Sequence, residues 1–249
     1  MPRQPRFLPP DNYFHIMNRG NNGQYIFTCD EDYAFYLEKL SDLKIEHPFD
    51  LYHYCLMGTH VHMLVKTQKD TIFSIFSKRL NLSYANYFKR TYGALGHFWQ
   101  GRFKNQLIDS DKYFLQCGKY IELNPFRAGL VSDPLDYKWS SYSHYALGKK
   151  SSIITDNIFY LEFGFDEKAR QDNYQKLVID EAIADSMSGK RLAIGSDSFV
   201  HNVSRKNKYH IKHRESPYRL PAGRQVKTVL KYEASPKLLN YSGSVVSLM

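Results

Sequence analysis

One stretch, YHYCLMGTHVHMLVK over residues 52–66, limits the possible folds more than any other part of the sequence. It holds two apolar runs, expected as strands over 50–57 and 61–66, which are separated only by Gly58 and Thr59. A connection this short favours an antiparallel hairpin. The chain is therefore expected to contain a sheet with this hairpin inside it.

Two histidines lie one residue apart at the second of these strands. Because strand side chains alternate between the two faces of a sheet, His60 and His62 are expected to point one way, and Val61 and Met63 the other. Two imidazoles on one rigid strand would make half of a metal site. A His-x-His pair also arises by chance in a chain with ten histidines, so the other half must come from elsewhere in the sequence.

The hydrophobic pattern before and after the hairpin predicts the other elements. They are a strand over 13–19, a helix over 31–46 capped by Asp30, a helix over 70–91, a strand over 97–108 and a helix that starts at Ser110 or Asp111. The order strand, helix, strand, strand, helix, strand matches the ferredoxin-like (RRM-like) pattern, an antiparallel sheet with two helices on one face. We therefore expect an α+β fold.

The last of these helices, DKYFLQCGKYIELNPFRAG, is where the second half of the site is expected. Gln116, Tyr120 and Asn124 follow one another at intervals of four, so one side of the helix presents an amide, a phenol and another amide. Pro125 should end the helix and place Asn124 at its last turn or just beyond. The alternative is that the tyrosine packs in the core and Asn124 caps the helix.

Charge is unevenly distributed along the 249 residues, whose formal net charge is +9. Residues 1–149 carry 18 basic and 14 acidic side chains, residues 150–199 carry 6 and 9, and residues 200–249 carry 10 and 2. The expected division is a main domain over 1–149, a small helical appendage over 150–203 with a helix over 166–184, and a basic, flexible tail over 204–249.

Residues 71–108 combine positive charge with aromatic rings. This window holds six basic residues, no acidic one and nine aromatic residues. Cations bind phosphates and rings stack on bases, so the window is typical of a protein that binds unpaired nucleic acid. The alternative is that the rings belong to helix cores and the basic side chains to a solvated helix face.

The three cysteines, Cys29, Cys55 and Cys117, have no C-x-x-C spacing, and the sequence has neither a signal-peptide pattern nor a long apolar run. A disulfide framework and a zinc finger are therefore not expected. A reduced protein of the cytoplasm is the expectation.

Four motifs occur in the order known from one family. They are the His60-Val61-His62 strand, FWQGRF over 98–103, KYIELNPFRAGLV over 119–131 and DYKWSSY over 136–142. Over about residues 10–145 the chain resembles the HUH single-tyrosine transposases and, among them, the REP-associated tyrosine transposases. Thr59 stands where relatives commonly have Asn, a departure that concerns loop geometry more than chemistry. Beyond residue 150 the resemblance fades.

The resemblance implies a metal-dependent enzyme that nicks and rejoins single-stranded DNA at hairpin repeats, within the cytoplasm and near the nucleoid. Tyr120 would be the nucleophile and form a covalent 5′-phosphotyrosine, and His60, His62 and Asn124 would hold Mg²⁺ or Mn²⁺, with no other cofactor. The expected DNA contacts are Arg19, Lys78, Arg79, Lys89, Arg90, Trp99, Arg102, Lys104 and Arg127. The protein would act as a monomer or a homodimer.

Other assignments stay open at the level of residues. Tyr113, seven residues before Tyr120 on nearly the same helix face, is the second candidate nucleophile, although a cysteine four residues after it is a poor ligand for Mg²⁺. His15 and Asn18 on the first strand could face the same cleft. His53 is expected at the edge of the core rather than in the site.

Two other functions also stay open. The chain could be a hairpin-binding protein without catalysis, although binding alone requires neither the histidines nor the tyrosine. It could also be a metal-dependent phosphodiesterase that never forms a protein–DNA adduct.

Overall fold

The structure, a computed structural model, describes residues 6, 8–69, 72–94, 96–109, 111–179 and 193–194. All of them belong to the first of two compact units, Met1–His210 and Ile211–Met249. The helix end expected over 180–184 and the tail expected over 204–249 lie outside the described residues. None of the described helices combines the length and the apolar character that crossing a membrane requires.

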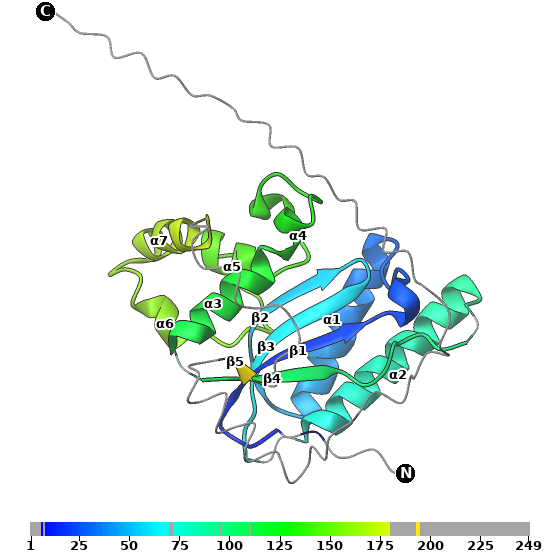
Figure 1. Cartoon of the computed structure of the whole chain (residues 1–249). Helices are drawn as coiled ribbons and strands as arrows, with labels where there is room; N and C mark the ends of the chain where they lie inside the picture. Colours follow the sequence, from blue (N-terminus) through cyan, green and yellow to red (C-terminus); the bar gives the residue numbers. More distant parts are fainter. Residues whose placement is uncertain are drawn as a thin grey trace, which may run out of the picture. The chain divides into compact units, whose positions relative to one another are not determined.

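Four antiparallel strands form the sheet, in the order β2-β3-β1-β4. Their bounds are β1 (Tyr13–Arg19), β2 (Asp50–Met57), β3 (His60–Lys66) and β4 (Lys104–Ile108). A short β5 (Ala193–Ile194) pairs in parallel with β4 at the edge of the sheet. The expected β2–β3 hairpin and the ferredoxin-like strand order are both confirmed (Figure 1).

Two helices, α1 (Asp30–Glu46) and α2 (Phe73–Tyr92), pack against each other on one face of this sheet (Figure 1). Strand residues Ile16, Val61 and Met63 join the apolar residues of both helices in one buried cluster. This layer corresponds to the two helices that the ferredoxin-like pattern predicts on one face. It also confirms the side on which Val61 and Met63 were expected.

A third helix, α3 (Asp111–Glu122), covers the opposite face of the sheet over β2 and β3. Its residues Phe114, Cys117 and Ile121 form a second buried cluster with Leu64 of β3. The alternation of side chains along β3 therefore places the two histidines of that strand beside α3.

A bulge in β2 brings an additional side chain to the α3 face. The pairing of β2 with β3 shifts register between Leu51 and His53. As a consequence Tyr52 and His53, which are adjacent in the sequence, both contact the ring of Phe114 in α3. Bulges commonly redirect side chains in this way.

The predicted cap of the first helix is wrong by one residue. Cys29, not Asp30, is the N-cap of α1. The buried carboxylate of Asp32 accepts hydrogen bonds from the backbone N–H groups of Thr28 and Cys29, and this fixes the turn one residue earlier.

The predicted strand over 97–108 is also too long. Strand pairing is confined to β4, and before it only Trp99 forms a single bridge, to Gly20 of the loop after β1. The rings of Phe98 and Trp99 lie beside Tyr84 of α2. Packing of these rings on α2 takes the segment away from the sheet.

Several short helices follow α3, which ends before Pro125 as expected. They are α4 (Asn124–Arg127), α5 (Tyr142–Leu147), α6 (Ile158–Leu161) and α7 (Glu167–Ile179), with the 3₁₀ turn η2 (Pro134–Asp136) between α4 and α5. Another 3₁₀ turn, η1 (Asn21–Gly23), lies between β1 and α1. The helix expected from residue 166 is present as α7. It packs against α5, and Tyr174 donates a hydrogen bond to Glu122 of α3. The domain boundary near residue 150 stays a prediction.

Candidate active site

The two histidines of β3 lie next to each other on the α3 face of the sheet. Their ring centroids are 4.9 Å apart, and His62 is buried. Burial lowers the pKa of His62 well below its usual value, with further lowering from His15 and His60. Burial and the charge of Arg19 also lower the pKa of His60. Both imidazoles are therefore neutral at neutral pH, which is the form that binds metal ions.

Each histidine has its Nδ1 atom engaged by a neighbour. The Nδ1 of His60 lies 2.9 Å from the hydroxyl of Thr59, and the Nδ1 of His62 lies 2.8 Å from the Nε2 of His15. Among the described residues, no hydrogen bond involves the Nε2 atom of either ring. Both Nε2 atoms are therefore available to a ligand.

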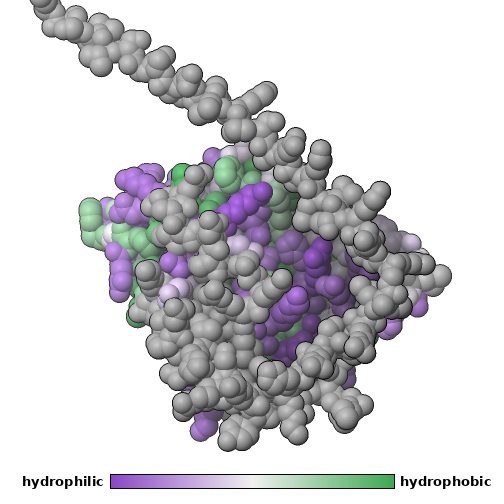
Figure 2. All heavy atoms as spheres, in the orientation of Figure 1, coloured by the Kyte–Doolittle hydropathy of each residue, from purple (hydrophilic) through white to green (hydrophobic). Residues whose placement is uncertain are grey.

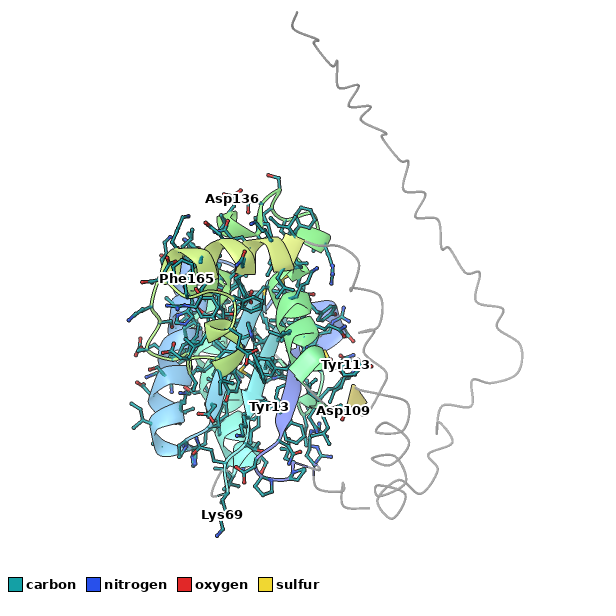
Figure 3. The ribbon with its side chains drawn as sticks, turned by 90° about the vertical axis from the view of Figure 1, so that its left-hand side faces the viewer. Tyr13, Lys69, Asp109, Tyr113, Asp136 and Phe165 are labelled. Carbon is teal, nitrogen blue, oxygen red and sulfur yellow. The ribbon has the colours of Figure 1, made fainter. Side chains whose placement is uncertain are left out.

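The phenol expected as the nucleophile lies beside these rings. The ring of Tyr120, near the end of α3, is 5.8 Å from that of His62 and 5.8 Å from that of His15, edge-on in both cases. Tyr113 lies near Asp109 at the start of α3 and packs against the cluster that includes Phe114 (Figure 3). The structure therefore brings Tyr120 to the histidines. Both histidines and Tyr120 line one cleft, and Tyr113 is not among its lining residues.

Two opposing effects act on the ionisation of Tyr120. Burial raises the pKa of its phenol, and Cys117 adds slightly to that rise. Arg127 of α4 lowers this pKa, because its guanidinium carbon lies 5.6 Å from the centre of the ring. A positive charge at this distance favours the phenolate.

Asn124, the residue expected as the third metal ligand, is directed to the end of α3. Its side-chain nitrogen donates hydrogen bonds to the carbonyl oxygens of Tyr120 (2.8 Å) and Ile121 (3.3 Å). It is not among the residues that line the cleft around His60 and His62. Its role as a ligand stays a prediction.

A divalent ion at His60 and His62 requires at least one further ligand from the protein. In the described part of the chain, no three His, Cys, Asp or Glu side chains are arranged to hold a metal, so His60 and His62 require a ligand of another type. Asn124 is chemically suitable, because its nitrogen is engaged while its Oδ1 accepts no hydrogen bond from a described residue. An amide oxygen suits Mg²⁺ or Mn²⁺, and the two imidazoles would also accept Zn²⁺ or Ni²⁺.

Two hollows meet at this site. A cleft of about 440 Å³ is lined by Arg19, Thr59, His60, His62, Lys104 and Tyr120, among others. A groove of about 980 Å³ runs beside α2 and the segment 96–103. Both are lined by Gly101 and Arg102, so the groove adjoins the cleft. Hydrophilic side chains gather over the sheet on the face shown in Figure 2.

Comparison with known proteins agrees with this geometry. The family model described as "Transposase IS200 like" matches residues 10–124, which hold the histidine pair, the tyrosine and Asn124. Residues 10–124 are therefore similar to IS200-like transposases. This similarity supports a transposase-type enzyme that acts on DNA. No curated protein matches the chain.

Two solved structures resemble this chain. The first, described as a REP-associated tyrosine transposase bound to a REP hairpin, is 19% identical with a TM-score of 0.50, and the match covers 64% of this chain and 96% of that one. The second, a candidate transposase from Deinococcus radiodurans, is 18% identical with a TM-score of 0.35, covering 48% and 95%. The first match supports the fold described above.

Most of the predicted DNA contacts lie in the cleft and the groove. Arg19 and Lys104 line the cleft, Lys78, Lys89 and Trp99 line the groove, Arg102 lines both, and Arg127 lies over the Tyr120 ring. The groove also contains exposed apolar side chains, Ile72 and Leu82. A lining of cations and apolar groups is suited to phosphates and unpaired bases.

Two predicted DNA contacts lie elsewhere. Arg79 forms a bidentate ion pair with Glu46 of α1 and is not among the residues that line the groove. Arg90 lines a separate hollow beside Phe35 and Tyr87. The structure does not bring either side chain to the cleft or the groove, and their contact with DNA stays a prediction.

The two residues of β1 that were expected near the cleft, His15 and Asn18, make different side-chain contacts. The ring of His15 lies on the cleft face, as expected, and is held between His62 and Gln106 of β4. Asn18 is among the residues that line the cleft, as expected, although its side-chain amide donates to Asn81 of α2.

A buried acidic residue of α3 was not predicted from the sequence. Glu122 of α3 is fully buried and accepts hydrogen bonds from His53 Nδ1 (2.9 Å), Ser141 Oγ (2.5 Å) and Tyr174 OH (2.7 Å). These four residues are called the Glu122 network below. The sequence does contain a signal for this burial. Glu122 follows Phe114 by eight positions and so belongs to the apolar stripe of the helix, although it is charged.

Proposed function

We propose that this chain is a single-tyrosine HUH transposase of the REP-associated type, which cuts and rejoins single-stranded DNA at hairpin repeats through Tyr120. The observation that carries the proposal is the position of the Tyr120 ring beside His62, in a cleft that also holds His60 and several basic side chains. A binding protein without catalysis would require no such arrangement.

The proposed reaction exchanges one phosphodiester for another. The Tyr120 phenol loses its proton, its oxygen attacks the scissile phosphorus, and the bond from phosphorus to the 3′-oxygen breaks. The 3′-oxygen takes up a proton and leaves as a free hydroxyl, while the 5′-phosphate stays on the tyrosine. Reversal by a 3′-hydroxyl rejoins the strand, so the bond energy is conserved without ATP.

Charge is the main obstacle that the site must overcome. An ordinary phenol is ionised to about one part in a thousand at neutral pH, and burial makes Tyr120 less acidic than that. Arg127 counters this effect. A divalent ion held by His60, His62 and Asn124 would act as a Lewis acid on the scissile phosphate. Arg19 and Lys104 line the same cleft and are suited to the neighbouring phosphates.

Single-stranded DNA with a hairpin is the proposed substrate. The groove beside α2 adjoins the cleft at Gly101 and Arg102, so one continuous strand can occupy both. Lys78 and Lys89 would contact its phosphates, and Trp99 would contact a base. The similar solved structure is described as bound to a REP hairpin, which supports the same class of substrate.

A covalent-adduct assay tests the proposal. The protein is incubated with a labelled hairpin oligonucleotide and Mn²⁺, and the products are separated on a denaturing gel. Wild type should give a slowly migrating protein–DNA band that the Tyr120→Phe variant does not form. Tyr113→Phe is the matched control and should form the band.

Each other outcome contradicts the proposal in a distinct way. An adduct in Tyr120→Phe that disappears in Tyr113→Phe would transfer the nucleophile to Tyr113. Cleaved DNA without any adduct would indicate a phosphodiesterase. Binding without cleavage would indicate a hairpin-binding protein.

A further inference from the structure

Three buried side chains on three neighbouring strands form one chain of hydrogen bonds behind the cleft. Oε1 of Gln106 in β4 lies 3.2 Å from Nδ1 of His15 in β1. Nε2 of His15 lies 2.8 Å from Nδ1 of His62 in β3. All three side chains are almost completely buried.

Sheet register holds these residues in place. His15 is paired with Gln106 across the β1–β4 ladder, and His62 is paired with Met17, two positions along β1. The rings of His15 and His62 lie edge to edge, with centroids 5.1 Å apart and planes inclined by only 22°, as the hydrogen bond between their nitrogens requires. The contact is therefore set by the strands and not by mobile loops.

The chemistry of the first atom fixes the direction of the whole chain. An amide oxygen only accepts hydrogen bonds, so the proton of the His15 ring must lie on Nδ1. A neutral imidazole has one N–H group, so Nε2 of His15 is an acceptor. Nδ1 of His62 must then donate to it, which leaves the lone pair of His62 on Nε2.

We propose that Gln106 and His15 are positioning residues that fix the tautomer of His62, so that its Nε2 is the atom presented to a divalent cation. The arrangement extends a common feature of metal sites, in which a ligating histidine donates its other N–H to a second residue. That a cation binds to His62 rests on the proposed function. The proton positions on His15 and His62 rest only on the hydrogen bonds described above.

His60 lacks a comparable constraint. Its Nδ1 contacts the hydroxyl of Thr59, which is able either to donate or to accept. The tautomer of His60 is therefore free to adapt, whereas that of His62 is fixed before any ligand arrives.

Nitrogen NMR of the full-length, ¹⁵N-histidine-labelled protein tests this directly, without metal or DNA and at neutral pH. Two-bond ¹H–¹⁵N correlations report which ring nitrogen carries the proton. Wild type should show the proton on Nδ1 in both His15 and His62. A proton on Nε2 of His62 would overturn the proposal, and this result needs no variant.

A pair of variants adds a second readout. Gln106→Leu removes the acceptor, and His62 should then populate both tautomers, with Mn²⁺ affinity in a titration with the metal alone weaker by about 10–100-fold. Thr59→Val is the control at the other histidine and should leave the His62 tautomer unchanged. An unchanged His62 tautomer in folded Gln106→Leu, as judged by circular dichroism, would also overturn the proposal.

These results are independent of the adduct assay. A fixed His62 tautomer without any adduct on Tyr120 would refute the proposed function and leave the inference standing. An adduct with the His62 proton on Nε2 would do the reverse.

Discussion

Arg127 and the burial of Tyr120 act in opposite directions on the same phenol. Burial raises the pKa of Tyr120, and the guanidinium of Arg127 lowers it. Because the phenolate is the proposed nucleophile, the rate of adduct formation should still be rising with pH at the upper end of the accessible range. The charge of Arg127 sets where that rise occurs.

The Arg127→Gln variant removes this charge and should raise the pKa of Tyr120. At any pH below that pKa the phenolate fraction then falls, by roughly tenfold for each unit of the shift. Initial rates of adduct formation between about pH 7 and 10 should therefore show a rise displaced to higher pH. Arg127→Lys keeps the positive charge and is the control. A uniformly slower rate with an unchanged pH profile would mean that Arg127 contacts only DNA.

The positions of single site residues were predictable where they follow from the two-residue repeat of a strand or the 3.6-residue repeat of a helix. Strand alternation placed His60 and His62 on one face, and the helical repeat placed Tyr120 near the end of α3. The position of Asn124 was predictable, and the hydrogen bonds from its amide to the carbonyl oxygens of Tyr120 and Ile121 agree with the alternative that Asn124 caps the helix. The contact of His15 with Gln106 depends on the register of β1 and β4, which no local pattern contains.

The helices and strands were predictable from the periodicity of hydrophobic residues, but the residues at which they begin and end were not. The strand expected over 97–108 shows why, because its aromatic residues satisfy a strand pattern equally well whether they pair in the sheet or pack on a helix. Phe98 and Trp99 pack on Tyr84 of α2. Whether these rings pair in the sheet or pack on α2 depends on tertiary contacts, which the local sequence pattern does not contain. Their packing on α2 forms part of the groove beside that helix.

The helix that carries Tyr120 is anchored through the Glu122 network. Glu122 accepts hydrogen bonds from β2, from the start of α5 and from α7, so elements far apart in the sequence hold one end of α3. The donor from α7, Tyr174, lies in the segment expected as an appendage. The position of α3 over the sheet should therefore depend on that segment.

Loss of the Tyr174 hydroxyl measures this dependence. Tyr174→Phe leaves the buried carboxylate with one donor fewer, and the free energy of unfolding should fall by about 1.5–3 kcal/mol, the range for hydrogen bonds to charged groups. Tyr160→Phe is a matched control, because its hydroxyl donates to the neutral carbonyl of Tyr145 at 2.8 Å and should cost only about 0.5–1.5 kcal/mol. Urea unfolding provides both values. Equal costs would show that Glu122 gains nothing particular from Tyr174.

The charge of the whole chain has two separable sources. Residues 200–249 carry 10 basic and 2 acidic side chains and lie outside the described residues. Lys78 and Lys89 line the groove, Lys104 lines the cleft that holds Tyr120, and Arg102 lines both. Charge in the tail would raise affinity for any polyanion, whereas charge in the groove acts on a strand that must also reach Tyr120.

Salt dependence of DNA binding tells these sources apart. The double variant Lys78→Gln/Lys89→Gln should weaken binding of hairpin DNA with single-stranded flanks, and should reduce the slope of log K against log salt by about 0.7 for each phosphate that the variant no longer neutralises. A hairpin without unpaired flanks should be bound almost equally by wild type and variant. Lys39→Gln/Lys168→Gln is the control of equal charge, because these lysines pair with Asp42 and Asp172 outside both hollows. If the control pair reduced the slope as much as the groove pair, net charge alone would explain binding, and the groove would not be the path of the strand.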